Sequence, residues 1–153
     1  MSDTSDVKIT TYQALAEFRY QIRRFVRFSE EVAQKGGLEP QHHQLLLALK
    51  GIPAGEAPRI AYLAERLQIR HHSAVELVDR LDKRGLIRRS RSRLDRREVH
   101  VKLTPRGERL LRELTLHTRA ELRSAAPTLV AALRNVMARN VPTRSTGRKR
   151  LIR

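Results

Sequence analysis

The strongest constraint on the fold is the spacing of apolar residues in the first part of the segment from 59 to 104. Two groups of four apolar residues each follow an i, i+3, i+4, i+7 pattern, which is typical of amphipathic helices that bury one face. Residues 68–70 lie between the two groups and form a tight turn. Gly85 follows the second group and can adopt the left-handed conformation that ends a helix. The groups are Ile60, Leu63, Ala64 and Leu67, then Ala74, Leu77, Val78 and Leu81.

A β-hairpin with a basic tip is predicted after Gly85. Its strands are expected at 86–90 and 98–103, and the second alternates in the way that half-buried strands do. In that alternation Val99, Val101 and Leu103 point inward, while Glu98, His100 and Lys102 point outward. The connection carries four arginines, Arg91, Arg93, Arg96 and Arg97, around a single Asp95. Helix, turn, helix and hairpin together predict a winged helix-turn-helix, in a chain that is otherwise mainly α-helical.

Four sequence pieces in this segment resemble the MarR family of bacterial transcription regulators. They are Leu-Ala-Glu-Arg-Leu at 63–67, Val-Asp-Arg-Leu-Asp-Lys-Arg-Gly-Leu-Ile at 78–87, Leu-Asp-Arg-Arg at 94–97 and Leu-Thr-Pro-Arg-Gly at 103–107. The pieces occur without gaps over about forty-five residues, in the order and spacing of that family. The resemblance implies a homodimer that binds near-palindromic double-stranded DNA and is often released when a small ligand binds.

The second helix of the helix-turn-helix is expected to read DNA. In such motifs the N-terminal residues of this helix meet base edges in the major groove. Arginine can bind guanine, and a glutamate such as Glu76 can accept a hydrogen bond from cytosine. Arg80 lies about one turn further on and is expected to contact phosphate. The predicted base contacts are Arg70, His71, His72, Ser73 and Glu76.

The wing is expected to contact DNA in a different way. The resemblance implies that an arginine at the tip enters the minor groove and that an aspartate two residues earlier orients it, a spacing that Asp95 and Arg97 share. A narrow minor groove concentrates negative potential, so such an arginine reads the shape of DNA. Arg93 and Arg96 are predicted phosphate contacts, and Arg91 completes the predicted DNA-binding set. Asp95 can also be read as an ordinary turn residue.

The charge of the chain is concentrated in and after this segment. The formal net charge is +16, yet residues 1–58 carry seven basic and seven acidic side chains. Residues 59–104 carry thirteen basic and six acidic side chains, and residues 105–153 carry twelve basic and three acidic side chains. Such a gradient fits one positive face presented to a polyanion. The same charge leaves a rival open, a nucleic-acid binder without operator specificity, either an RNA-binding winged helix or a chromosome-coating protein.

The flanking regions predict long helices for dimerisation. One helix is expected over residues 7–35 with a narrow apolar seam, and a second over 40–50; residues 1–58 are assigned to dimerisation and to part of a ligand cleft. A helix is expected to start at Thr104 and Pro105 and to run to about Ala126. Pro127 marks a break or a new start, so residues 105–140 hold C-terminal dimerisation helices. Residues 141–153 are expected to form a basic disordered tail.

Other functional classes find little support in the sequence. There is no cysteine, which excludes disulfides and thiol redox sensing. No phosphate-binding glycine loop or nucleophile elbow is present, so an enzyme is not expected. No cofactor or metal site is predicted, although His42 or His43 near His117 keeps a zinc or nickel sensor open. A small-molecule effector, such as an aromatic acid or other anion near Arg19, Arg23 or Tyr12, also stays open. Without a membrane span or signal peptide, we expect a cytoplasmic protein with no membrane partner.

Overall fold

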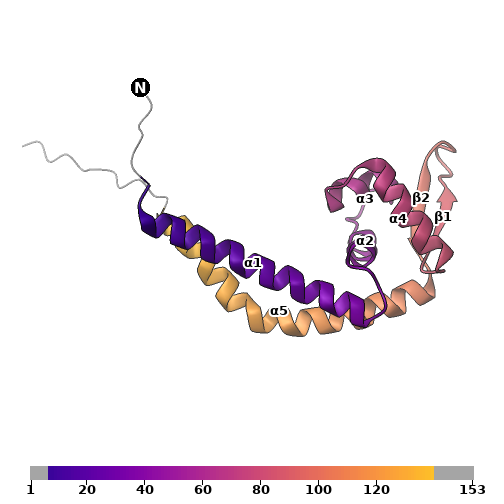
Figure 1. The fold of residues 1–153 in the computed structure, drawn as a ribbon. Coiled ribbons are helices and arrows are strands. Elements are labelled where there is room, and N and C mark those ends of the chain that lie inside the picture. Colours follow the sequence, from indigo (N-terminus) through magenta and orange to yellow (C-terminus); the bar gives the residue numbers. More distant parts are fainter. Residues whose placement is uncertain (1–6, 140–153) are drawn as a thin grey trace, which may run out of the picture. The chain divides into compact units, whose positions relative to one another are not determined.

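The computed structural model describes residues 7–139, which form five helices and one β-hairpin (Figure 1). The chain divides into two compact units, one of residues 26–122 and one that combines the described residues up to Phe25 with those from Arg123 onward. Two long helices run through both units. The elements are α1 (Ile9–Lys35), α2 (Pro40–Lys50), α3 (Ile60–Leu67), α4 (His71–Lys83), β1 (Ile87–Arg91), β2 (Val99–Leu103) and α5 (Pro105–Arg139).

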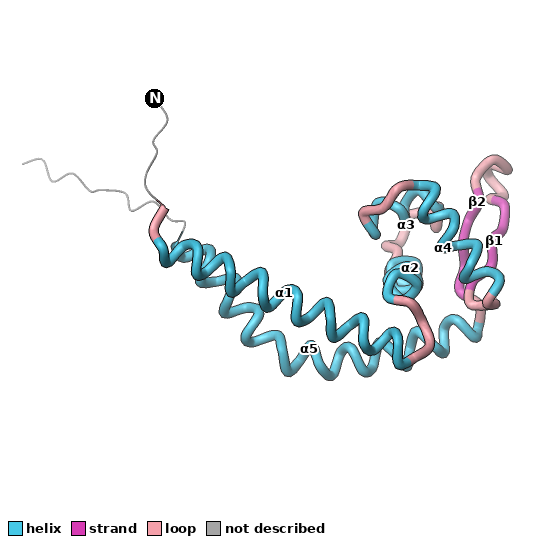
Figure 2. Tube along the Cα trace, viewed as in Figure 1, coloured by secondary structure: helices cyan, strands magenta, loops and turns pink. Residues whose placement is uncertain are grey.

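The larger unit, residues 26–122, has a continuous apolar core. The faces of α3 and α4 predicted from their periodicity point into it, and α2 packs against both helices (Figure 2). Leu63, Val78 and Leu81 are completely inaccessible to solvent. Leu111 and Leu114 extend the core along the first half of α5. The helix-turn-helix predicted from the sequence is therefore confirmed, including the end of α3, and the helix predicted separately over 40–50 is confirmed as α2.

The corner that follows α4 determines where the wing begins. Gly85 has a φ of 69°, and the amides of Gly85 and Leu86 donate to the carbonyls of Asp82 and Leu81, which closes the end of the helix. The hydroxyl of Thr104 donates to the carbonyl of Gly85 at 2.7 Å and accepts from the amide of Gly107 at 3.1 Å. The predicted role of Thr104 as the cap of the following helix is thus confirmed. A side chain on Gly107 would overlap the backbone of Leu86.

The wing is a two-stranded antiparallel sheet, β1 with β2. Ile87 pairs with Leu103 and Arg91 with Val99, so each strand begins one residue later than the sequence predicted. The other edge of β2 meets the segment before α3, because the amide of Val101 donates to the carbonyl of Pro58. Only part of the predicted alternation holds. Val101 is buried, Leu103 is half-buried, and Val99 is exposed because it pairs with Arg91 next to the tip of the hairpin, beyond the core.

Two predicted helix boundaries are wrong. The first helix begins at Ile9, two residues after the predicted Val7. The predicted break at Pro127 does not occur, because α5 continues through this proline to Arg139. A proline inside a helix loses its own hydrogen bond and costs roughly 3 kcal/mol. Alanines on both sides favour the helix, and Ala132 is buried beyond the proline. The predicted tail at 141–153 lies outside the described residues.

The smaller unit contains the first part of α1 and the last part of α5. Buried residues are few, with Ala14, Gln21 and Ala132 the clearest. Phe18, Ile22 and Phe25 of the predicted seam are half-buried, whereas Leu15 is exposed. Much of the apolar surface in this unit therefore remains accessible to solvent. The exposed large apolar side chains include Ile9, Tyr12, Leu15, Tyr20, Val130, Leu133 and Met137.

Two histidines of α2 lie in the core of the larger unit. His42 is 3% exposed and His43 is 2% exposed, and no ring nitrogen of either has a hydrogen-bond partner. Burial lowers the pKa of both side chains from the ordinary value of 6.5. For His42, Glu39 opposes this effect, while Arg84 and Arg80 add to it. Both histidines are therefore neutral in the folded protein at pH 7.

Lowering the pH is expected to destabilise the fold through these histidines. The unfolded chain binds their protons below about pH 6.5, while the folded chain resists protonation, so stability is lost as the pH falls below that value. Denaturant titrations between pH 7 and pH 5 will measure the free energy of unfolding. The substitution His43→Leu is expected to make it fall less steeply with pH. The substitution His117→Leu removes an exposed histidine of α5 as a control, and equal slopes in all three proteins would contradict the assignment.

Candidate nucleic-acid interface

The start of α4 presents the residues that the sequence assigned to base contacts. Arg70 is the N-cap residue and has extended backbone angles, with no side chain capping the helix. His71, His72 and Glu76 are exposed and Ser73 is half-buried. The first amides of a helix without a cap, together with the helix dipole, attract an anion. The start of α4 thus offers basic side chains and free backbone donors on the same turn.

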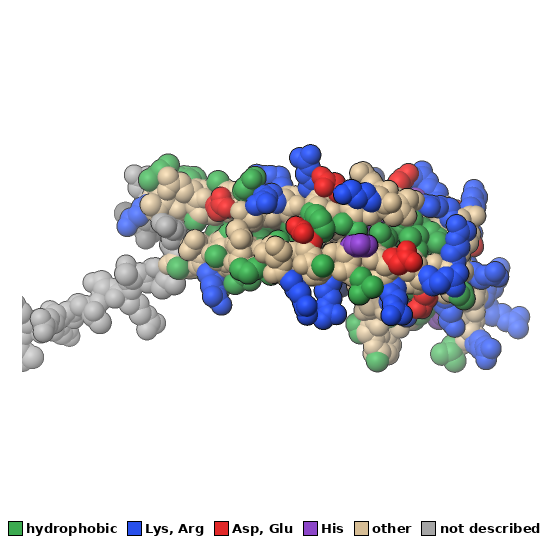
Figure 3. Space-filling model, turned by 90° about the horizontal axis from the view of Figure 1, so that it is seen from below, with side chains coloured by type: hydrophobic (Ala, Val, Ile, Leu, Met, Phe, Trp, Pro, Cys, Tyr) green, Lys and Arg blue, Asp and Glu red, His purple; other side chains and the backbone are tan. Residues whose placement is uncertain are grey.

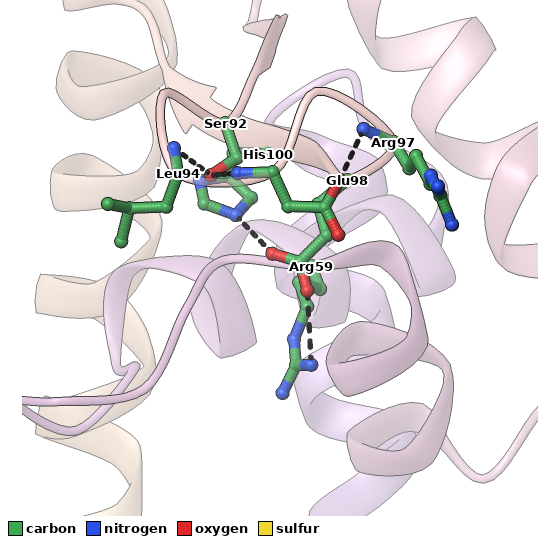
Figure 4. A network of polar contacts seen from close by, with 7 residues as sticks. Arg59, Ser92, Leu94, Arg97, Glu98 and His100 are labelled. Carbon is green, nitrogen blue, oxygen red and sulfur yellow. Dashed lines mark hydrogen bonds and ion pairs between the residues drawn. The ribbon is translucent and has the colours of Figure 1, made fainter.

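The wing tip is held in shape by its own hydrogen bonds (Figure 4). The buried hydroxyl of Ser92 accepts from the amides of Leu94 and Asp95 at 3.2 and 3.3 Å. A carboxylate oxygen of Asp95 accepts from the backbone amide of Arg97 at 2.9 Å. In the free protein Asp95 therefore binds the backbone of Arg97 and acts as a turn residue. The guanidinium of Arg97 extends away from the tip (Figure 4).

A groove of about 610 Å³ lies between the start of α4, the start of α3 and the wing. It brings together three of the predicted DNA contacts, His71, Arg91 and Arg97. Val75 and Val99 contribute apolar surface to it. The other predicted contacts are outside this groove. The N-cap residue Arg70 is exposed and Ser73 is half-buried, and the rest lie on exposed positions of α4 or the wing. Those on α4 are His72, Glu76 and Arg80, and those on the wing are Arg93, Asp95 and Arg96.

Two arginines of the groove were missed by the sequence analysis. Arg89 of β1 forms ion pairs with Asp79 at 2.6 Å and Asp82 at 3.4 Å, both on α4. Arg59 precedes α3 and lies 3.6 Å from Glu98, whose other carboxylate oxygen is 3.2 Å from His100 (Figure 4). These contacts join the wing to α4 and to the start of α3. The spacing of the acids on α4 is visible in the sequence, but the crossing of β1 over them is not.

Basic side chains gather over the part of the molecule that holds α4 and the wing (Figure 3). Arg88, Arg91, Arg93, Arg96 and Arg97 are all exposed there. Within residues 7–139, no group of three or more His, Asp or Glu residues is arranged to hold a metal ion. Across the same residues, no helix has the length and apolarity needed to cross a membrane. The positive surface with its groove is the candidate site that the geometry supports.

Comparisons with known proteins agree with this geometry. Residues 36–98 match the model of the MarR family. The crystal structure of AbsC, a MarR family transcriptional regulator from Streptomyces coelicolor, is similar with a TM-score of 0.69 and 23% identity, covering 80% of this chain and 82% of AbsC. A MepR mutant from S. aureus bound to an oligodeoxyribonucleotide is similar with a TM-score of 0.61 and 17% sequence identity, covering 83% of this chain and 96% of MepR. BpsR from Bordetella bronchiseptica is similar with a TM-score of 0.62 and 22% sequence identity, covering 82% of this chain and 96% of BpsR. No curated protein sequence matches the chain.

Removing the Asp95 carboxylate is expected to loosen the wing tip without unfolding the protein. The substitution Asp95→Ala deletes the acceptor of the Arg97 amide, and one such bond contributes about 1 kcal/mol. Hydrogen exchange of the Arg97 amide, followed by NMR, is expected to accelerate about fivefold. The control Glu76→Ala, at an exposed position of α4, is expected to leave that amide unchanged. Undiminished protection in Asp95→Ala would show that other contacts hold the tip.

Proposed function

We propose that the chain is a DNA-binding transcriptional repressor, because residues 36–98 match the model of the MarR family and the chain shares the fold of MarR family transcriptional regulators. In this proposal a homodimer binds an inverted-repeat operator. The observation that carries the proposal is the groove in which His71, Arg91 and Arg97 meet beside the uncapped start of α4. A reading helix and a basic wing on one surface suit simultaneous contact with the major and minor grooves of DNA.

Two sets of donors support DNA as the ligand of this surface. The free amides and basic side chains at the start of α4 match base edges and phosphates. The arginines of the wing match the negative potential of a minor groove. The S. aureus MepR mutant with a similar fold was solved with an oligodeoxyribonucleotide. We assign the base contacts to Arg70, His71, His72, Ser73 and Glu76, and the minor-groove contact to Arg97.

The exposed apolar side chains of the smaller unit support a homodimer. Ile9, Tyr12 and Met137 are all more than half exposed, although they lie on two amphipathic helices. Apolar surface of this extent on a small unit marks an interaction site. A second copy of the same helices supplies a matching apolar surface through a twofold axis. Binding to an inverted repeat requires two reading helices about one turn of DNA apart.

A pocket between α2 and α5 supports regulation by a small ligand. It has a volume of about 500 Å³, and its lining combines Leu47, Leu111 and Leu116 with Arg109, Arg112 and Arg119. Apolar surface with a few charged groups is typical of sites for small organic molecules. DNA binding by BpsR, which has a similar fold, is regulated by 6-hydroxynicotinic acid. We propose this pocket for an organic anion that weakens DNA binding, in place of the site that the sequence suggested near Arg19, Arg23 or Tyr12.

The proposed operator binding predicts a strong effect of Arg97→Ala. We expect the wild type to bind the DNA upstream of its own coding sequence more tightly than random duplex of equal length at about 0.15 M salt. Arg97→Ala is expected to weaken operator binding about 10- to 100-fold. Fluorescence anisotropy titrations will measure both affinities, with Arg27→Ala of α1 as an exposed arginine control. Equal wild-type binding to the two duplexes would instead favour the binder without operator specificity.

The proposed dimer predicts that charge in the smaller unit separates the subunits. Leu15 and Leu133 are each 42% exposed, and burying a glutamate at either position of an apolar interface is costly. The double substitution Leu15→Glu, Leu133→Glu is expected to convert a dimer into a monomer at micromolar concentration. Sedimentation equilibrium will measure the mass, with Leu94→Glu on the wing as a matched control. A wild-type protein with the mass of one chain would contradict the dimer.

A further inference from the structure

Leu94 at the tip of the wing has no structural role within the described residues. Its side chain is fully exposed, whereas Ile9, the next most exposed large apolar side chain, reaches 69%. It points away from the contacts between Arg59, Glu98 and His100 (Figure 4). A leucine at this position therefore adds nothing to the core of the protein, and its apolar surface is available to stabilise a complex in which a partner covers it.

The backbone around Leu94 is fixed in the free protein. The amide of Leu94 donates to the buried hydroxyl of Ser92, and the amide of Glu98 donates to the carbonyl of Asp95. The side chain consequently leaves the tip from a defined position. An apolar group on a preorganised loop contributes more to binding than one on a loop that must first be ordered.

The charges around Leu94 identify the kind of surface that it meets. Arg93 and Arg96 are exposed on either side of it in the sequence, and only Asp95, which binds the backbone amide of Arg97, offsets them. A positive tip with one apolar side chain complements the minor groove of DNA, where phosphates flank the apolar faces of the sugars. Apolar side chains are used in this groove by other DNA-binding proteins.

Building on the proposed DNA-binding function, we propose that Leu94 enters the minor groove with the wing and packs against deoxyribose on one wall. Leu94 and the guanidinium of Arg97 leave the tip in opposite directions (Figure 4). The two side chains therefore meet opposite walls of one groove. This arrangement makes the wing sensitive to the width of the minor groove, because the two side chains can reach both walls at once only when the groove is narrow.

Leu94→Ala tests the contact in the full-length protein. The variant is expected to bind the upstream duplex about tenfold more weakly, the loss that removal of one buried leucine side chain produces. Leu94→Met keeps the length and the apolar surface and is expected to retain wild-type affinity. Because Leu94 is fully exposed, both variants are expected to unfold at the wild-type temperature.

The salt dependence separates an apolar contact from a phosphate contact. The slope of log K against log salt is expected to be unchanged in Leu94→Ala, whereas Arg93→Ala is expected to reduce it by about one. Hydroxyl-radical cleavage reports on minor-groove sugars, so wild type and Leu94→Met are expected to protect sugars that Leu94→Ala leaves open.

Three outcomes would overturn the Leu94 contact. If the wild type binds DNA and Leu94→Ala keeps its full affinity and sugar protection, the contact is wrong while the proposed function stands. A reduced salt slope in Leu94→Ala would mean that the leucine acts through the arginines and not through the sugars. Wild-type protein that binds neither the upstream nor the random duplex would overturn the proposed function and the contact together.

Discussion

The position of the wing relative to α4 depends on one corner of the chain, formed by Gly85, Leu86, Thr104 and Gly107. The positive φ of Gly85 turns the backbone out of α4 and into β1. When the chain returns along β2, Thr104 binds the carbonyl of Gly85 and caps α5 with the same hydroxyl. The absence of a side chain on Gly107 lets α5 lie directly against the backbone of Leu86. One set of short-range contacts thus fixes the helix, the hairpin and the start of α5 together.

Local features of the sequence were sufficient to predict most of the larger unit. Helix boundaries that depend on a single residue, such as those at Gly85 and Thr104, were located correctly because that residue carries the physical cause. The prediction at Pro127 was wrong because a proline acts on one hydrogen bond, whereas the helix as a whole is stabilised by its neighbours and by burial of Ala132. Secondary-structure propensity is a local quantity, and tertiary packing overrides it.

The candidate site was predictable in its residue types but not in its connections. Counting arginines identified the wing, yet it did not distinguish arginines that bind other residues from those that remain free for a ligand. Arg89 is held by two carboxylates of α4, and Arg59 by Glu98. The side chains of these ion pairs are 35–47% exposed, so each ion pair contributes little to the free energy of unfolding. Their effect is geometric, since they join the wing to the two helices that border the groove.

The two halves of the proposed interface satisfy their backbone donors in opposite ways. The wing tip binds its amides internally through Ser92 and Asp95, so its shape is set before any ligand arrives. The start of α4 has no side-chain cap, so its amides stay available to water or to an anion. A rigid wing suits recognition of groove shape, because little ordering is required on binding. An uncapped helix suits recognition of charge, because the energy that a cap would contribute within the free protein becomes available in the complex.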